Sequence, residues 1–204
     1  ERYELDRDEQ RRVAGLIRGE ADRLGRMVVS FLELERLGSG RWPDERRLLD
    51  LSALVARRCR SLEASREGAV LRLDAPAAAT ILGDPELVER LVDNLVGNAL
   101  KFSPAGVPVE VAVESAPAGV SLQVRDRGPG IPEEALPRLF ERFFRVPGST
   151  APGTGLGLAL AREVAEWHGA EIHVSSALGQ GSTFTVLFPA AERSVGDAAE
   201  RAGG

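Results

Sequence analysis

The feature that most constrains the fold is a helix pattern that begins at Asp84 and Pro85, where aspartate can cap the helix and proline suits its first position. The apolar side of this pattern contains Leu87, Val88, Leu91, Val92, Leu95 and Val96. Asn94, Asn98 and Lys101 follow at i, i+4 and i+7, so they share another face. Asparagine is a poor helix former, so two of them in mid-helix favour a functional face over a merely solvated one.

The polar face of this helix suits a metal-bound phosphate. An amide oxygen is a hard, neutral ligand that is appropriate for Mg²⁺ already bound to phosphates and waters. The ammonium of Lys101 can neutralise phosphate as a compact point charge. It is the single lysine among 26 basic residues, so its presence in a chain that otherwise uses arginine is informative.

A second segment, Asp-Arg-Gly-Pro-Gly at residues 126–130, follows a predicted strand. Taken alone it is best interpreted as a plain turn, because aspartate and glycine favour turns in any protein. At the end of a central strand, however, the carboxylate of Asp126 can accept a hydrogen bond from the exocyclic amine of adenine. The glycines would let the backbone lie close to the base.

A third segment, Gly-Thr-Gly-Leu-Gly at residues 153–157, opens another helix. Backbone N–H groups at the start of a helix attract phosphate oxygens. A glycine-rich hinge is the alternative, and the dinucleotide-binding fingerprint fits poorly because the loop does not directly follow a strand. The small residues of 145–154 just upstream could form a lid over a nucleotide.

The N-terminal segment, residues 6–37, predicts one long amphipathic helix that starts with an Asp-x-x-Glu capping box. Ile17, Leu24 and Phe31 recur every seven residues, as in a coiled-coil or bundle seam. We expect this stripe to need a partner helix, most simply on a second chain. Packing against the globular part of the same chain is the alternative.

The rest of the chain alternates between helix and strand patterns. Further helices are expected at 51–66, 85–102 and 156–168, a short aromatic segment at 136–144, and strands at 70–73, 80–82, 107–114, 119–125, 171–176 and 183–188. The expected organisation is helix, linker, globular domain and disordered tail, at residues 1–40, 41–47, 48–189 and 190–204. The fold class is α+β, a two-layer sandwich of helices on a mixed, mostly antiparallel sheet.

Composition excludes several classes of protein. A net charge of −5 and a pI near 5.3 give no basic footprint for nucleic acid. The one cysteine, Cys59, excludes an intrachain disulfide and suits a reducing compartment, where a packed side chain is the expected role. No apolar run approaches the ~18 residues of a membrane span, and no signal peptide is evident. Because the chain starts at Glu1 without methionine, we expect a cytoplasmic fragment without membrane contact, whose parent could be anchored in the inner membrane.

The chain resembles the catalytic part of bacterial two-component sensor histidine kinases. Five segments occur in the order of the N, G1, F, G2 and closing-strand motifs of that family, at residues 94–101, 126–130, 140–144, 153–158 and 179–184. The likeness covers about residues 48–189, and residues 8–37 resemble the second helix of the dimerisation and phosphoacceptor domain. The resemblance implies a Bergerat-type ATP-binding fold, shared with DNA gyrase, heat-shock chaperones and mismatch-repair ATPases.

The resemblance also implies roles for individual residues. Mg²⁺ coordination falls on Asn98, with Asn94 close by. Phosphate contact falls on Lys101 and adenine recognition on Asp126, with a water-mediated contribution from Thr183. The nucleotide-binding backbone of the glycine segments falls on Gly128, Gly130, Gly153, Thr154, Gly155, Leu156 and Gly157.

One position discriminates within this superfamily. Hydrolysing members and the related serine kinases place a glutamate four residues before the metal-binding asparagine, where it activates the attacking water or hydroxyl. This chain has Asn94 there, which cannot take a proton, so phosphoryl transfer to a histidine is favoured over rapid hydrolysis. A hydrolysing or serine-directed enzyme and a degenerate, dimeric binding scaffold are the two alternatives.

The resemblance finally implies partners. The acceptor histidine should lie on a first helix ahead of Glu1, in a hairpin that forms a homodimer, and the phosphoryl group should pass on to an aspartate of a response-regulator receiver domain. His168 follows a helix in Trp-His-Gly, and His173 alternates along a strand, so neither has the acidic helical context of an acceptor. We therefore expect the fragment to bind ATP without phosphorylating itself.

Overall fold

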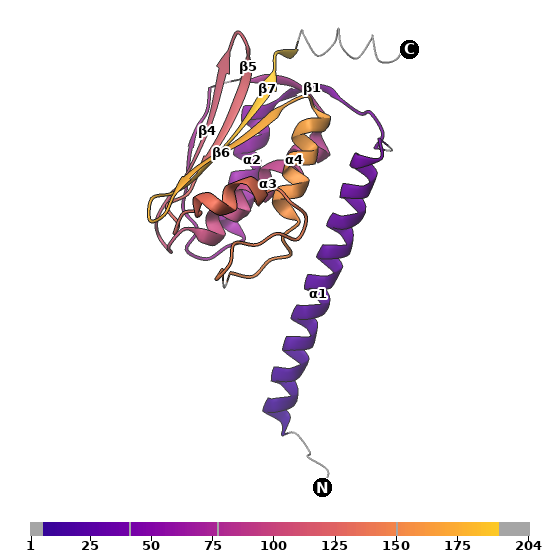
Figure 1. Ribbon diagram of the computed structural model, residues 1–204, viewed down its shortest axis with the longest axis vertical. Helices are drawn as coiled ribbons and strands as arrows, with labels where there is room; N and C mark the ends of the chain where they lie inside the picture. Colours follow the sequence, from indigo (N-terminus) through magenta and orange to yellow (C-terminus); the bar gives the residue numbers. More distant parts are fainter. Residues whose placement is uncertain (1–5, 41, 77, 150, 192–204) are drawn as a thin grey trace.

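The computed structural model describes residues 6–40, 42–76, 78–149 and 151–191, which form a two-layer body with one long helix projecting from it (Figure 1). The elements in chain order are α1 Arg7–Gly38, β1 Arg47–Asp50, α2 Leu51–Ala64, β2 Leu71–Asp74, β3 Thr80–Gly83, α3 Pro85–Phe102, β4 Val109–Ala116, β5 Gly119–Arg125, the 3-10 helix η1 Glu133–Arg138, α4 Gly157–Trp167, β6 Glu171–Ala177 and β7 Gly181–Pro189.

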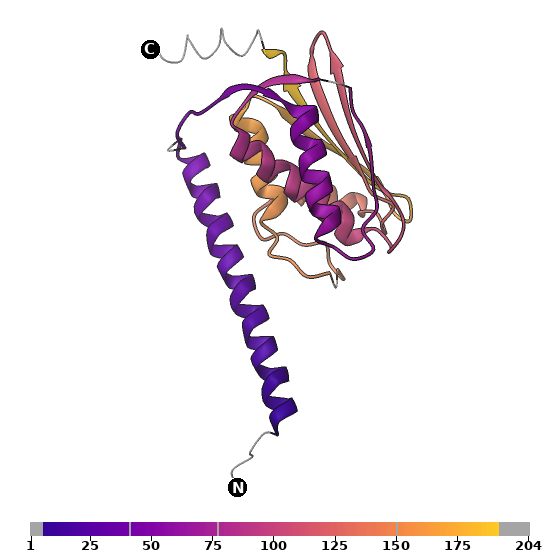
Figure 2. The same cartoon turned by 180° about the vertical axis from the view of Figure 1, so that it is seen from behind.

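One layer is a five-stranded sheet with the order β2-β4-β5-β7-β6. The β2–β4 pair is parallel and the other pairs are antiparallel. The helices α2, α3 and α4 form the second layer on one face of this sheet, as Figures 1 and 2 both show. The arrangement confirms the predicted α+β sandwich with a mixed, mostly antiparallel sheet.

The core lies between the two layers and follows from the sequence periods. Alternate residues of the central strand β5 face the helices, so Val120, Leu122 and Val124 are buried. The apolar side of α3 meets them, and its six large side chains are at most 1% exposed. Each such side chain contributes roughly 1.5–3 kcal/mol when it leaves water, so α3 is firmly fixed in the sandwich.

The helix α1 differs along its length. Asp6 caps it with hydrogen bonds from the N–H groups of Asp8 and Glu9, as the capping box predicts. Most of the seven-residue stripe is open, with Ile17 65% and Leu24 52% exposed. At the other end Leu34 is fully buried, because the last turns of α1 pack against α4. The end of α1 therefore packs on the globular part, while the stripe farther upstream is exposed. That part of the helix projects away from the body (Figure 2).

Ion pairs fasten the end of α1 to the body of the molecule. Glu33 lies 2.8 Å from the guanidinium of Arg90 on α3. Glu35 lies 2.6 Å from Arg142, a residue of the segment that precedes the glycine loop.

No helix within the described ranges has the length and apolar character needed to cross a membrane.

The strand β1 is an element that the sequence analysis missed, since it placed residues 41–47 in a linker and gave 48–50 no structure. The strand pairs antiparallel with β3, with Arg47 opposite Gly83. A four-residue strand offers too few positions for an alternation pattern, and its Leu48 is 67% exposed. The ordered turn near the aromatic segment is η1, which begins and ends earlier than the predicted 136–144. The predicted tail lies mostly outside the described residues.

Candidate functional site

Three half-buried side chains line one face of α3, as predicted: Asn94, Asn98 and Lys101. The Asn94 Nδ2 donates to the carbonyl of Arg90 at 2.9 Å, one turn back. Its Oδ1 faces the glycine loop, since a Cβ placed on Gly157 would lie 2.7 Å from that oxygen. Within the described part of the chain, the Asn98 amide has no hydrogen-bond partner, so it remains available to a ligand.

The carboxylates in the middle of α3 point elsewhere. Asp93 accepts two hydrogen bonds from Arg58 of α2, at 2.8 and 2.7 Å. Glu89 pairs with the neighbouring Arg57. The groups of α3 that lie against the glycine loop are the Asn94 amide and the Lys101 ammonium. The described residues contain no cluster of three or more His, Cys, Asp or Glu side chains that could hold a metal, so a cation here would need oxygens from its own ligand.

Positive charge gathers at the C-terminal end of α3. The Nζ of Lys101 lies 4.6 Å from the centre of the Phe102 ring. A Cβ placed on Gly153 would lie 2.9 Å from the same Nζ. Burial lowers the pKa of Lys101, and the charges of Arg145 and Arg66 lower it further. Like charges held together raise the local potential, which suits a polyanion such as a triphosphate.

Asp126 lies at the end of β5 and is 4% exposed. Its Oδ1 accepts hydrogen bonds from the N–H of Gly128 at 2.8 Å and from the N–H of Ser182 at 3.2 Å. Burial raises the pKa of Asp126, and these hydrogen bonds oppose that rise. Because both backbone donors reach Oδ1, the other oxygen is the one that can accept from a ligand. Ser182 was missed by the sequence reasoning, although it precedes Thr183 in the closing-strand motif.

The turn that follows Asp126 is held by direct backbone contact. Gly130 has φ +74°, and a Cβ there would lie 2.1 Å from the carbonyl oxygen of Ala177 on β6. The N–H of Gly179 donates to the carbonyl of Pro129 at 2.8 Å. On the other side, a Cβ on Gly128 would lie 2.8 Å from the carbonyl oxygen at the end of α3. The turn is thus wedged between α3 and the β6–β7 hairpin.

The loop at residues 145–154 is closed at its base and lightly held within. The N–H of Phe143 donates to the carbonyl of Gly155 at 2.9 Å, and both residues have positive φ, 65° and 75°. A Cβ on Gly155 would lie 2.6 Å from the backbone of Phe143, so only glycine fits this contact. Inside the loop, Nη2 of Arg145 donates to the carbonyls of Ser149 and Ala151 at 3.1 and 2.7 Å. The sequence analysis had not singled out Phe143 or Arg145.

The remaining predicted site residues take structural positions around these parts. Leu156 is fully buried at the start of α4, and its N–H donates to Oγ1 of Thr154 at 3.3 Å. Thr183 lies on β7 opposite Arg125, the last residue of β5, which Asp126 follows. In the described structure its side chain makes no hydrogen bond to Asp126, so the structure brings the two near without joining them.

Both histidines have structural surroundings. His168 follows α4 and is 3% exposed, with Nδ1 2.7 Å from the carbonyl of Val164. Its Nε2 accepts from the N–H of Asp84 at 3.0 Å, and burial lowers the pKa of the ring. His168 is therefore a packed, hydrogen-bonded side chain of the core. His173 is exposed on β6, 3.1 Å from Glu171.

Cys59 is buried in α2, as expected, and desolvation raises its pKa to about 11.

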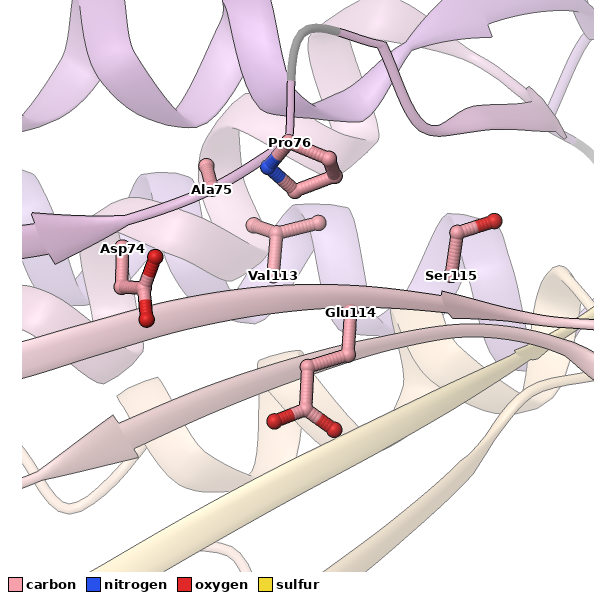
Figure 3. Close-up of a pocket in the computed structure, with 6 residues that line it drawn as sticks. All are labelled: Asp74, Ala75, Pro76, Val113, Glu114 and Ser115. Atoms are coloured by element: carbon pink, nitrogen blue, oxygen red, sulfur yellow. The ribbon is translucent and has the colours of Figure 1, made fainter.

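A hollow elsewhere on the sheet does not compete with this site. It lies between β4 and the segment after β2, and Figure 3 shows its lining: Asp74, Ala75, Pro76, Val113, Glu114 and Ser115. The hollow lies at the hairpin end of β4, because Glu114 pairs with Ser121, whereas Asp126 lies beyond the opposite end of β5. Two carboxylates and no cation make the hollow unsuitable for a polyphosphate.

The elements of this site define a class of protein. A helix with amide and ammonium groups faces a glycine loop, and a buried carboxylate follows a central strand packed on the same helix, which is the architecture of a nucleotide-binding α+β sandwich. Residues 83–192 match the family described as "Histidine kinase-, DNA gyrase B-, and HSP90-like ATPase". The chain belongs to this family, whose description implies ATP as the nucleotide.

Individual relatives place the chain among sensor histidine kinases. The sensor-like histidine kinase SenX3 of Mycobacterium tuberculosis is 38% identical over 191 residues, which cover 91% of this chain and 46% of the relative. The phosphate regulon sensor protein PhoR of Pseudomonas aeruginosa is 34% identical over 179 residues, which cover 85% and 40%. The chain therefore spans less than half the length of each of these relatives.

Solved structures agree with these relatives. The mycobacterial sensor histidine kinase MprB matches with a TM-score of 0.64 and 30% identity, over 71% of this chain and 97% of that chain. The full-length ShkA structure, in complex with AMPPNP, matches with a TM-score of 0.75 and 27% identity, over 92% of this chain and 41% of that chain. This chain carries the ATP-binding catalytic domain of a sensor histidine kinase.

Proposed function

We propose that the domain binds Mg·ATP along α3 and transfers the γ-phosphoryl group to a histidine of a separate helix. The observation that carries the proposal is that one helix borders both ends of the site. Asn94 and Lys101 approach the glycine loop at Gly157 and Gly153. The turn after Asp126 packs on the C-terminal end of the same helix, at the carbonyl of Phe102. A nucleotide laid along α3 would meet the carboxylate with its base and the amide face with its phosphates.

The donor set fits this ligand. Asp126 would accept a hydrogen bond from the exocyclic amine of adenine through the oxygen that Gly128 and Ser182 leave free. Asn98, with Asn94 beside it, would hold Mg²⁺, and the lysine at the end of α3 would offset phosphate charge. When bound, Mg²⁺ supplies charge neutralisation and fixes the geometry of the phosphate oxygens. ShkA, a relative in structure, is described in complex with AMPPNP, which agrees with this use of the fold.

The catalytic contribution would come from positioning and charge. Asn94 occupies the place of a general base, but an amide cannot take a proton. The nearest carboxylates on its helix, Glu89 and Asp93, are engaged by arginines of α2. Water activation therefore has no evident agent on this face of α3. An acceptor histidine already carries a nucleophilic nitrogen, so phosphoryl transfer to it needs only alignment and neutralisation.

In this proposal the whole protein acts in two-component signalling. The helix α1 would be the second helix of a dimerisation and phosphoacceptor hairpin, and its open stripe would pair with helices of a second copy. The phosphoryl group would then pass to an aspartate of a response-regulator receiver domain. His168 is buried and His173 lies on the sheet, so the acceptor would be neither. We propose that the domain works in the cytoplasm, whether or not the parent is anchored in the inner membrane.

Calorimetric titration with a non-hydrolysable ATP analogue, with and without Mg²⁺, tests the proposal. We expect binding that Mg²⁺ strengthens, that Asp126→Ala abolishes, and that loses its Mg²⁺ dependence in Asn98→Ala. Absence of binding by the unmodified chain would favour the scaffold alternative, and rapid phosphate release from ATP would favour a hydrolysing enzyme. With γ-labelled ATP, we expect no stable label on this chain alone.

A further inference from the structure

A serine behind the nucleotide-binding turn joins three separate backbone segments. Ser176 lies on β6, in the β6–β7 hairpin that supports the turn. Its Oγ accepts from the N–H of Ile131 at 2.8 Å and donates to the carbonyl of Gly181 at 2.9 Å. It also lies 3.0 Å from Oγ of Ser182. These contacts join β6 to the end of the turn at Ile131 and to the start of β7.

The hydrogen-bonding capacity of a hydroxyl limits how the contact between Ser176 and Ser182 can be made. A serine hydroxyl offers one donor and two acceptor positions. Ser176 gives its proton to Gly181 and accepts from Ile131, so its remaining position is an acceptor. Either hydroxyl of this pair can be the donor; while Ser176 donates to Gly181, the hydroxyl of Ser182 is the group that can donate to Ser176. All three positions of Ser176 are then occupied.

Ser182 is in turn the partner of the base-binding carboxylate. The N–H of Ser182 donates to Oδ1 of Asp126 at 3.2 Å, and the N–H of Asp126 donates to the carbonyl of Ser182 at 2.9 Å. Ser182 is 6% exposed, so loss of its hydroxyl partner would not be replaced by bulk water. Ser176 thus holds both ends of the turn, at Asp126 through Ser182 and at Ile131 directly.

We propose that Ser176 is a positioning residue for base recognition, which aims the free carboxylate oxygen of Asp126 at the 6-amino group of a purine. It touches no nucleotide itself and acts through Ser182 and Ile131. The inference rests on the proposed function, because it presumes that Asp126 recognises the base. Its signature is therefore selectivity for the 6-amino group, and not affinity for triphosphate in general.

The test compares two nucleotides in each variant. Affinities for ATP and for the analogue in which hydrogen replaces the 6-amino group are measured by calorimetry on the whole chain, without hydrolysis. For Ser176→Ala we expect the ATP preference to fall about three- to tenfold, the range of one hydrogen bond, while affinity for the analogue stays the same. Ser175→Ala is the matched control, because Ser175 is the exposed neighbour on the same strand, and it should keep the preference.

A double-mutant cycle separates positioning from a general structural effect. Ser182→Ala should reduce the preference to a similar degree, and the double variant Ser176→Ala with Ser182→Ala should lose little more, since both remove one coupled contact. A partly unfolded variant lowers both affinities alike, so the preference within each variant is insensitive to folding. An unchanged preference in Ser176→Ala, or additive losses in the cycle, would overturn the inference.

The same measurements distinguish failure of the inference from failure of the proposed function. An unmodified chain that prefers ATP, together with a Ser176→Ala variant of equal preference, would leave the proposed function intact and remove the role of Ser176. An unmodified chain that binds neither nucleotide would overturn the two together. One that binds both equally would remove base recognition by Asp126, and the inference with it, while leaving binding of the triphosphate.

Discussion

The two ends of the proposed nucleotide site are built in opposite ways. The base end, the turn after Asp126, is packed backbone against backbone between α3 and the β6–β7 hairpin, with Gly130 against Ala177. The proposed phosphate end, the loop at residues 145–154, is closed where Phe143 meets Gly155, and its described residues are held by hydrogen bonds from Arg145, by one from Ser149 to Val146, and by the packing of Val146 on the core. One end is fixed by close contact of backbone with backbone, whereas the described part of the other is held by a few hydrogen bonds and one partly buried side chain.

This difference matches two different tasks. Recognition of a base edge needs one carboxylate oxygen in one direction, so a rigid support is an advantage. Admission and release of a charged phosphate group need a cover that can open, and low local stability permits that motion. The predictions below test whether rigidity and adaptability are really divided in this way.

The largest expected effect comes from a matched pair of glycine substitutions. Gly130 and Gly148 have φ values of +74° and +79°, but a Cβ on Gly130 would lie 2.1 Å from Ala177 while Gly148 has open space around it. We expect Gly130→Ala to lower the free energy of unfolding by about 3 kcal/mol or more, and Gly148→Ala by about 1 kcal/mol. Urea unfolding measures both, and equal losses would contradict the division into rigid and adaptable ends.

Next in size is the effect of Asp126→Asn on binding and stability. We expect ATP affinity to fall about 10- to 100-fold, the range for a hydrogen bond to a charged group. Since burial raises the pKa of Asp126, its ionised form opposes folding above that pKa. The free energy of unfolding should therefore rise in Asp126→Asn at neutral pH.

The pH dependence gives a second measure of the same residue. As the pH falls through the raised pKa, Asp126 becomes protonated in the unmodified protein, and the stability gain of Asp126→Asn should shrink. ATP affinity of the unmodified protein should begin to fall at a higher pH than an ordinary aspartate would allow. Denaturation and ATP binding measured between about pH 7 and pH 4 check these two expectations. A stability gain of Asp126→Asn that grows on acidification would exclude the raised pKa of Asp126 as its cause.

A smaller effect is expected from Arg145→Ala, which removes the hydrogen bonds to Ser149 and Ala151 inside the loop. We expect limited proteolysis to cut the loop faster, with little change in global stability, because no buried side chain is lost. Affinity for ATP should fall about threefold or more, while affinity for adenosine stays unchanged. Equal losses for ATP and adenosine would show that the loop also shapes the base end.

The smallest effect concerns the titration of Lys101. Burial and the charges of Arg145 and Arg66 lower its pKa, so the ammonium loses its proton at a lower pH than an ordinary lysine. We expect ATP affinity to decline on alkalinisation at a lower pH than it would if an ordinary lysine stood there. Lys101→Arg should remove that decline, because arginine stays protonated. The ionised lysine opposes folding, and this penalty should disappear as the pH rises through the lowered pKa.

Local chemistry accounts for the parts of the fold that were predictable. The start of α3 follows from Asp84, whose carboxylate accepts from the N–H groups of Glu86 and Leu87. The face that carries Asn94 and Asn98 follows from helical periodicity alone. The strand β1 was not predictable, because its stability comes from pairing with β3 more than from its own pattern. The partial burial of α1 likewise depends on α4, a helix from the far end of the chain.

The sequence by itself determined which groups are available to a ligand: two amides and one ammonium on a helix, a carboxylate before a flexible turn, and a glycine loop. These are properties of neighbouring residues, and they survive in any fold that forms the same local elements. The tertiary structure decided how these groups are held and aimed. Ser182 supports Asp126 from 56 residues away, and Ser176 supports Ser182. Such contacts arise when β5, β6 and β7 pair in one register, and no local pattern specifies that register.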